Sequence, residues 1–302
     1  FWELALEPEQ VIKLSGIGCS SKTPAYFLSG AHGFNSVHGR MPSVATGAQA
    51  ARRDLIAVGI SGDGDSLSIG FGQFAHAVRR NLNVLYIIEN NGVYGLTKGQ
   101  FSASADPGSK AKKGAENRNQ AIDPIATAIT LGGSFAARSF SGDKKQLVPL
   151  IKAGLMHPGC AVIDVVSPCV TFNDHEGSTK SYAWTRQHLH ATIEADYVPP
   201  ASEIEVDYAD GEHTEVALHD GSLIQLKKID PDYDPSNRAR ALDFLEDHRA
   251  RQEVVTGLLY IDEALPSFHD IAGTSKQALT HYSFEELNPG ADALAELQKG
   301  LR

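Results

Sequence analysis

The stretch from Ser61 to Gln100 constrains the fold more than any other part of the chain. An apolar run, Leu55 to Ser61, ends in a Gly-Asp-Gly turn, and apolar residues then recur at helical spacing as far as Arg80. A second apolar run, Val84 to Ile88, follows. Short apolar runs predict buried strands, and a strand, a helix and a strand in succession predict a βαβ unit. We therefore expect an α/β fold with a doubly wound parallel sheet.

Polar residues stand just beyond both of these strands. Asp63 lies in the first turn, and Asn91 follows the second strand. Ligands of parallel sheets bind beyond the carboxyl ends of the strands, so both residues should face one crevice. Their side-chain oxygens, with a backbone carbonyl just after Asn91, suit Mg²⁺, and phosphate oxygens and water would complete the octahedron. Asp-Gly and Asn-Gly are also ordinary turn dipeptides, but their pairing across one βαβ unit favours a site for a metal and a diphosphate.

Other segments bring further groups to the same crevice. A turn of small residues, Gly16 to Lys22, follows the strand-like run Val11 to Ser15, so its backbone can approach a planar ring closely. The tripeptide Gly95-Leu96-Thr97 offers backbone N–H groups and a hydroxyl to phosphate oxygens. Lys22 and Arg40 are cations near the crevice that can pair with carboxylates. We therefore expect a cofactor that carries a diphosphate.

Several short motifs narrow this expectation to one family. They are GIGCSSK at 16–22, HGR at 38–40, ATG at 45–47, GDGD at 62–65, HAVRRN at 76–81 and YGLTKGQFS at 94–102, with 26 residues between the GDG turn and Asn91. The spacing resembles the thiamine-diphosphate signature, and residues 8–174 together resemble the β subunit of 2-oxoacid:ferredoxin oxidoreductases, most closely the 2-oxoglutarate type. The resemblance implies a thiamine-diphosphate-binding fold of the pyrophosphate-domain type. It also implies Mg²⁺, a [4Fe–4S] cluster, and oxidative decarboxylation of a 2-oxo acid to acyl-coenzyme A with reduction of ferredoxin.

The same resemblance implies roles for individual residues. Mg²⁺ would be held by Asp63, Asn91 and the carbonyl oxygen of Val93. The cofactor would be contacted by Ile17, Gly18, Cys19, Ser20, His38, Gly64, Asp65, Gly95, Leu96 and Thr97. The Glu that contacts the aminopyrimidine ring in such proteins belongs to the α subunit, so the chain should be inactive alone.

Three residues are assigned to the catalytic side of the site. His38 matches a family position that touches the diphosphate end of the cofactor, although a lone His is more often structural. We expect Lys22 to help hold the 2-oxo acid, with Arg40 as a second cation. A solvated Lys is the alternative for Lys22.

The three cysteines are too few for a disulfide scaffold and indicate a reducing cytoplasm. Cys160 lies inside a strand-like run and is expected to be a buried small hydrophobe. Cys19 and Cys169 each follow a strand and should point into the crevice. The resemblance makes these two the thiolate ligands that the chain contributes to the [4Fe–4S] cluster, and the other two are expected from a Cys-x-x-Cys pair upstream of Phe1.

Composition excludes two classes of partner. A net charge of −10 at pH 7 argues against a nucleic-acid partner, which requires a basic face. No run of eighteen or more apolar residues is present, so we expect no membrane span. The expected partners are the α subunit, ferredoxin, coenzyme A and the 2-oxo acid.

The chain divides by pattern into residues 1–174, the cofactor-binding α/β domain, and residues 175–302, an extension. The extension carries two Asp-Gly dipeptides between alternating segments, which predicts a β-meander, and then helical segments at 236–254 and 283–301. We expect it to pack on the core and on partner subunits.

Two other classes of function fit the bare motif. One is a non-redox thiamine-diphosphate decarboxylase or carboligase subunit, which would lack the cluster and its visible absorbance. The other is a non-catalytic nucleotide-binding module, which would not bind thiamine diphosphate with Mg²⁺.

Overall fold

The computed structural model describes residues 1–109, 115–167, 169, 206–217, 223–229, 232–251 and 253–301. The expected domain boundary near residue 174 and one of the Asp-Gly dipeptides, at 220–221, lie outside these residues.

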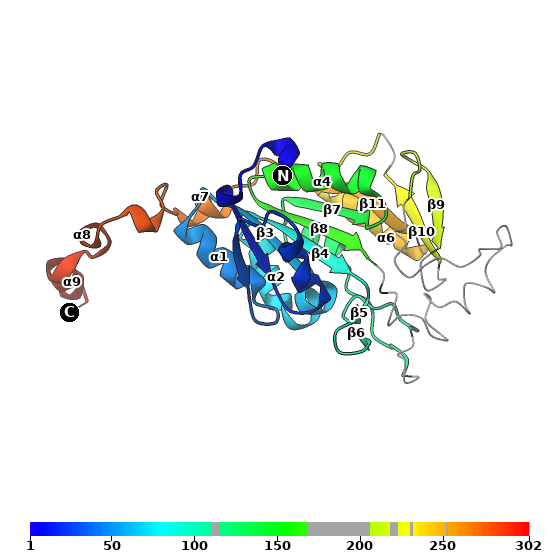
Figure 1. Cartoon of the computed structure of the whole chain (residues 1–302), viewed down its shortest axis with the longest axis horizontal. Helices are drawn as coiled ribbons and strands as arrows, with labels where there is room; N and C mark the ends of the chain where they lie inside the picture. The colour runs from blue at the N-terminus through cyan, green and yellow to red at the C-terminus, as the bar shows by residue number, and fades with distance from the viewer. Residues whose placement is uncertain are drawn as a thin grey trace.

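One mostly parallel sheet organises the described residues, with nine strands in the order β2-β1-β3-β4-β8-β7-β11-β10-β9 (Figure 1). In that order the strands are β2 (His32–Asn35), β1 (Val11–Ser15), β3 (Ile56–Gly62), β4 (Val84–Asn90), β8 (Cys160–Val166), β7 (Phe135–Phe140), β11 (Val254–Ile261), β10 (Leu223–Lys228) and β9 (His213–Ala217). Every neighbouring pair from β2 to β7 is parallel, while β11 runs antiparallel to β7. The predicted βαβ unit is therefore present as β3, α2 (Phe71–Arg79) and β4.

Helices cover both faces of this sheet. One apolar cluster joins α1 (Met41–Ala51), α2, α3 (Pro124–Thr130) and α6 (Arg238–Ala250) to one face, and a second joins α4 (Lys144–Met156) to the other. Strand alternation separates the two clusters, because Tyr86 and Ile88 of β4 enter the first while Leu85 and Ile87 enter the second. The doubly wound α/β fold is thus confirmed.

Capping side chains fix where two of these helices begin. Asp123 accepts hydrogen bonds from the backbone N–H groups of Ile125 (2.8 Å) and Ala126 (3.0 Å) at the start of α3. Asp143 accepts one from Gln146 (3.1 Å) at the start of α4. Such caps satisfy N–H groups that have no partner within the helix.

The structure differs from the sequence expectation at three segments near the amino end. Residues 32–35, whose aromatic and glycine-containing sequence is typical of an irregular loop, form the edge strand β2. Residues 3–10, whose sequence is typical of the end of a helix, contain two 3-10 turns, η1 (Trp2–Leu4) and η2 (Pro8–Gln10). The Gly-Asp-Gly turn continues into a π-helical turn, η4 (Gly64–Ile69). Edge strands that are exposed throughout, as β2 is, carry no alternating pattern for a sequence to show.

The α/β core does not end near residue 174 as the sequence pattern indicated. Strands β11, β10 and β9 continue the same sheet, and α6 packs against α3 and β11. The antiparallel pair β9–β10 agrees with the predicted meander. The division into two domains stays a prediction.

The described end of the chain leaves the sheet beside α7 (Phe268–Ala272). Figure 1 shows α8 (Phe284–Leu287) and α9 (Gly290–Lys299) extending away from the body. Among the described residues, no helix combines the length and the apolar character needed to cross a membrane.

Candidate cofactor site

Asp63 and Asn91 lie together at the carboxyl ends of β3 and β4. The Asp63 carboxylate is 1% exposed and accepts hydrogen bonds from the backbone N–H groups of Asn91 (3.4 Å) and Gly92 (3.1 Å). The side-chain oxygen of Asn91 accepts one from the N–H of Val93 (3.0 Å). The two turns therefore lie in contact, as their positions after neighbouring parallel strands predicted.

Two serines also bind the Asp63 carboxylate, and sequence reasoning missed both. Ser102 and Ser104 each donate a hydroxyl hydrogen bond to Oδ2 of Asp63, the second at 2.6 Å. The small, polar and charged residues that follow them are typical of an exposed loop, yet Ser102 is buried. The available signal was the alternation Ser-x-Ser directly after the GLTKGQ motif, on a segment that returns over the turn.

The Asp63 carboxylate is buried without a cation beside it among the described residues. Desolvation raises the pKa of Asp63 above its usual value, and the hydrogen bonds from Ser102, Ser104 and Asn91 oppose that rise only in part. No ion pair within the described part of the chain includes Asp63. The oxygen groups of Asp63, Asn91 and Val93 are the ligand types that Mg²⁺ takes, so the residues present fit the metal that the family implies.

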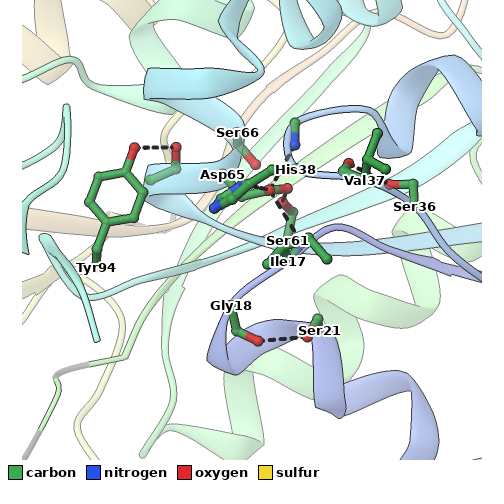
Figure 2. Close-up of polar contacts among 12 residues, drawn as sticks. Ile17, Gly18, Ser21, Ser36, Val37, His38, Ser61, Asp65, Ser66 and Tyr94 are labelled. Carbon is green, nitrogen blue, oxygen red and sulfur yellow. Dashed lines mark hydrogen bonds and ion pairs between the residues drawn. The ribbon is translucent and has the colours of Figure 1, made fainter. Parts of the chain in front are cut away.

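Asp65, two residues further on, is held by partners from the protein itself (Figure 2). Its Oδ1 accepts hydrogen bonds from the backbone N–H groups of Ile17 (3.3 Å) and Gly39 (2.8 Å) and contacts Nδ1 of His38. Its Oδ2 accepts one from the Ser61 hydroxyl. Asp65 was expected to contact the cofactor, whereas its observed bonds join three segments of the chain and orient His38.

Close packing around Asp65 depends on a glycine. A Cβ atom at Gly16 would stand 1.8 Å from Oδ2 of Asp65. Only glycine lets the loop after β1 approach this carboxylate so closely. The small-residue turn that the sequence singled out therefore packs directly on the GDGD motif.

Tyr94 packs against the GDG turn. The sequence pattern did not single this residue out. It lies in β5 (Val93–Tyr94), and its hydroxyl donates to the carbonyl oxygen of Gly64 (2.9 Å), as Figure 2 shows. A Cβ atom at Gly64 would stand 2.5 Å from the Tyr94 ring. The ring centroids of Tyr94 and His38 are 6.3 Å apart, so two aromatic rings stand beside the turn.

The remaining predicted residues surround this centre at different depths. Ser20, in the 3-10 turn η3 (Cys19–Tyr26), is buried, and a Cβ atom at Gly62 would meet its hydroxyl oxygen at 2.9 Å. Gly18 is half-buried, Lys22 and Arg40 are exposed, and Gly95 is buried. Leu96 and Thr97 are exposed beyond β5, with the Thr97 hydroxyl donating to Gln100 (2.6 Å).

The three cysteines occupy different environments. Cys160 is buried in β8, and burial raises the pKa of its thiol to about 12, as expected of a structural hydrophobe. Cys19 is exposed at the start of η3, and Cys169 is partly exposed after β8. Among the residues that the structure describes, no group of three or more His, Cys, Asp or Glu side chains could hold a metal ion. The cluster ligands stay a prediction.

A separate cavity of about 310 Å³ lies on the α4 face of the sheet. Its lining is mostly apolar and includes Phe27, Ile60, Ile87 and Val165. Asp63, Asp65 and His38 are not part of that lining, so the cavity is distinct from the candidate site.

Known proteins match this geometry. Residues 16–165 match the family described as thiamine pyrophosphate enzyme, C-terminal TPP binding domain. The chain is 45% identical over 181 residues to the 2-oxoacid:ferredoxin oxidoreductase subunit beta of Saccharolobus solfataricus, covering 60% of this chain and 59% of that protein. It is 39% identical over 173 residues to the 2-oxoglutarate oxidoreductase subunit KorB of Mycobacterium tuberculosis, covering 57% of this chain and 46% of that protein. The matched part thus spans about half the length of these relatives.

A solved structure extends the similarity to nearly the whole chain. It is the 2-oxoglutarate:ferredoxin oxidoreductase from Magnetococcus marinus with 2-oxoglutarate, coenzyme A and succinyl-CoA bound. The TM-score is 0.73 at 29% identity, with 97% of this chain and 85% of that chain covered. The resemblance drawn from the motifs is confirmed: residues 16–165 belong to the thiamine pyrophosphate-binding family, and the chain is similar to the β subunits of 2-oxoacid:ferredoxin oxidoreductases.

Proposed function

We propose that this chain is the β subunit of a 2-oxoacid:ferredoxin oxidoreductase of the 2-oxoglutarate type. The observation that carries the proposal is the buried Asp63 carboxylate, which faces the Asn91 turn and has no cationic partner among the described residues. A buried carboxylate of this kind is stabilised by a bound cation. The family match supplies the cofactor whose diphosphate would share that cation.

Each residue of the crevice has a task in this proposal. Thiamine diphosphate, when bound, supplies the carbanion chemistry by which a 2-oxo acid loses carbon dioxide. Asp63, Asn91 and the Val93 carbonyl would hold Mg²⁺, and the segment Gly95 to Thr97 would offer backbone N–H groups and a hydroxyl to the diphosphate oxygens. Ile17 to Ser20 and Gly64 would place backbone against the cofactor, and a Cβ atom at Gly18 would meet nothing within 4 Å, so the chain leaves space beside that glycine.

His38 is the residue that holds a proton at the diphosphate end. A carboxylate can only accept, so the contact with Asp65 places a proton on Nδ1 of His38 and leaves Nε2 as the acceptor of the neutral ring. Asp65 thereby fixes both the ring and its tautomer. This arrangement supports a role for His38 beyond the structural one that a lone histidine usually has.

Lys22 and Arg40 are the cations assigned to the substrate. Both are exposed, on the η3 turn and immediately before α1. A dicarboxylate such as 2-oxoglutarate needs two cationic partners, and charged hydrogen bonds to carboxylates are stronger than neutral ones. The neighbouring structure was solved with 2-oxoglutarate and coenzyme A bound, which favours the same substrates here.

Electron transfer and assembly complete the proposal. Cys19 and Cys169 would bind a [4Fe–4S] cluster with two further thiolates, and electrons would pass one at a time through that cluster to ferredoxin. The α subunit would supply the Glu for the aminopyrimidine ring, and the acyl group would go to coenzyme A. We place the complex in the cytoplasm.

The test is isothermal titration of thiamine diphosphate into the purified complex with and without Mg²⁺. Binding that requires Mg²⁺, and that disappears in Asp63→Ala, supports the proposal. Asp54→Ala is the matched control, because Asp54 precedes the same strand but is exposed and paired with Arg52 (2.6 Å). Absence of Mg²⁺-dependent binding in the wild type would identify a different kind of module.

A second measurement addresses the redox part of the proposal. Anaerobically purified complex should be brown and should reduce ferredoxin when given 2-oxoglutarate and coenzyme A. Thiamine diphosphate binding without a cluster absorbance would instead identify a non-redox decarboxylase or carboligase.

A further inference from the structure

A buried guanidinium lies two strands away from β4, in the middle of the sheet. Arg138 of β7 pairs in register with Asp164 of β8, and the two side chains are 9% and 1% exposed. Arg138 donates from Nε to Oδ2 of Asp164 (2.7 Å) and from Nη2 to Oδ1 of Asp123 (2.6 Å). One cation therefore lies between two carboxylates, one in a strand and one at the start of α3.

The hydrogen bonds continue from Asp164 to the candidate metal ligand. Asn90, the last residue of β4, donates its amide N–H to Oδ1 of Asp164 (3.0 Å). The amide oxygen of Asn90 is 2.9 Å from the Ser104 hydroxyl, which is 2.6 Å from Oδ2 of Asp63. A chain of polar contacts thus joins Arg138 to Asp63 through Asp164, Asn90 and Ser104.

The direction of the bonds from Arg138 to Asn90 is determined by chemistry. A carboxylate such as Asp164 only accepts, so the NH₂ end of Asn90 must face it and the oxygen end must face Ser104. The single hydroxyl proton of Ser104 is then shared between two acceptors, the Asn90 amide oxygen and the Asp63 carboxylate. Asp164, which Arg138 holds in place, therefore decides which group of Asn90 faces the serine that contacts Asp63.

The charges of the same residues point to a divalent ion. Asp63, Asp164 and Asp123 contribute three negative charges and Arg138 contributes one positive charge, all buried or partly buried. Fully ionised, the set carries two more negative charges than positive ones, and a cation at Asp63 would reduce this excess. Uncompensated charge in a region of low dielectric is costly, so the network favours the loaded site.

We propose that Arg138 is a positioning residue, which holds the Asp63 carboxylate ready for the metal and the diphosphate through Asp164, Asn90 and Ser104. The inference rests on the proposed function, because it concerns the residues that would receive Mg²⁺. Arg138 does not touch the cofactor, and its effect passes through hydrogen bonds. Outer hydrogen-bond partners of this kind orient the ligands of metal sites.

A matched variant distinguishes a role of Arg138 in stability from its proposed role in positioning Asp63. Lys228 of β10 is also a buried cation that pairs with a helix-capping carboxylate, Asp143 (3.4 Å) at the start of α4. Lys228→Met removes a buried cation from a helix cap, as Arg138→Met does, but the bonds of Lys228 go to Asp143 and to the Tyr208 carbonyl, away from Asp63. Loss of stability without loss of positioning should therefore appear in Lys228→Met.

The experiment measures the Mg²⁺ concentration that half-saturates thiamine diphosphate binding to the purified complex, by isothermal titration at a fixed cofactor concentration. Arg138→Met should raise that concentration about tenfold, the usual effect of losing such a partner. Ser104→Ala should raise it similarly, and the double variant should be no worse than the single ones, because both changes break one path. Arg138→Lys should recover only part of the loss, since an ammonium lacks the planar fork that reaches both carboxylates.

The outcomes separate this inference from the proposed function. Wild-type protein that fails to bind thiamine diphosphate with Mg²⁺ overturns the proposed function. Wild-type binding, with loss in Asp63→Ala but an unchanged Mg²⁺ requirement in Arg138→Met, overturns only the role of Arg138. A rise of the same size in Lys228→Met, or additive effects of Arg138→Met and Ser104→Ala, would also overturn it.

Discussion

The two carboxylates of the GDGD motif, Asp63 and Asp65, are two residues apart in the sequence but have different kinds of partner in the structure. Asp65 is surrounded by donors from three segments, including His38, and joins them. Asp63 accepts bonds from two serines and two backbone N–H groups, yet no cation of the described chain faces it. The observed bonds of Asp65 thus join three segments of the site, whereas the lack of a cation beside Asp63 among the described residues is the basis of the proposal that Asp63 binds a ligand.

The largest expected effect concerns ligand binding at Asp63. Asp63→Asn keeps the shape and removes the charge, so Mg²⁺-dependent thiamine diphosphate affinity should fall by about 100-fold or more, beyond the effect of an outer partner. The apoprotein should become more stable, because a buried charge without a cation is lost. Titration calorimetry and urea unfolding of the same samples measure both effects. Lower stability together with full binding would reverse the roles assigned to the two carboxylates.

Asp65→Ala should lower the stability of the apoprotein, whereas Asp63→Asn should raise it. Removing this acceptor leaves the N–H groups of Ile17 and Gly39 and the Ser61 hydroxyl unpaired, at about 1–3 kcal/mol of unfolding free energy for each fully buried group. Urea unfolding of the apoprotein measures the loss. Unchanged stability would contradict the architectural role of Asp65.

Gly16→Ala tests how closely the first loop must approach Asp65. The added Cβ would lie 1.8 Å from the carboxylate, so unfolding free energy should fall by about 1–3 kcal/mol, as overpacking usually costs. Gly47→Ala in α1 is the control, because a Cβ there meets nothing within 4 Å and alanine favours helices. Thermal unfolding of the two variants should move in opposite directions.

The pH dependence of stability sharpens the comparison further. Burial raises the pKa of Asp63 above its usual 3.8, so the native apoprotein binds this proton more tightly than the unfolded chain does. Proton binding by Asp63 therefore stabilises the native state. This stabilisation is fully present below the pKa that Asp63 has in the unfolded chain, and it is lost as the pH rises through the raised pKa of Asp63 in the native protein. The stability difference between Asp63→Asn and wild type should therefore shrink as the pH is lowered through that window. Urea unfolding at several pH values without Mg²⁺ measures it, and a difference that does not change with pH would contradict the raised pKa.

The smallest expected effect belongs to Tyr94. Tyr94→Phe removes the bond to the Gly64 carbonyl, which is worth about 0.5–1.5 kcal/mol. Cofactor affinity should change little, since the ring still packs against the turn. Thermal unfolding and titration of the same variant check both statements.

Periodicity was enough to predict much of the fold. The buried strands β1, β3 and β4 appear within two residues of their predicted bounds, because each is a continuous apolar run. The turns that follow β3 and β4 were predictable as well, since glycine and asparagine mark them. Asp63 and Asn91 followed from the rule that places ligands at the carboxyl ends of parallel strands.

The partners of those residues could not be predicted in the same way. Ser102 and Ser104 reach Asp63 because a polar loop folds back over the turn, and the Ser-x-Ser alternation by itself does not show where that loop packs. The local sequence around Arg138 does not single it out, because its contact with Asp164 depends on which strand lies beside β8 in the sheet. Local sequence determines periodicity, whereas these contacts are set by tertiary packing.

The central claim is that Asp63 holds a divalent ion together with the diphosphate of the cofactor. Electron paramagnetic resonance of the purified complex, with Mn²⁺ replacing Mg²⁺ and thiamine diphosphate added, tests it most directly. The account predicts one bound Mn²⁺ per chain with hyperfine coupling to the ³¹P nuclei of the diphosphate, and loss of that signal in Asp63→Asn. A phosphorus-coupled Mn²⁺ signal of wild-type strength in Asp63→Asn would contradict it.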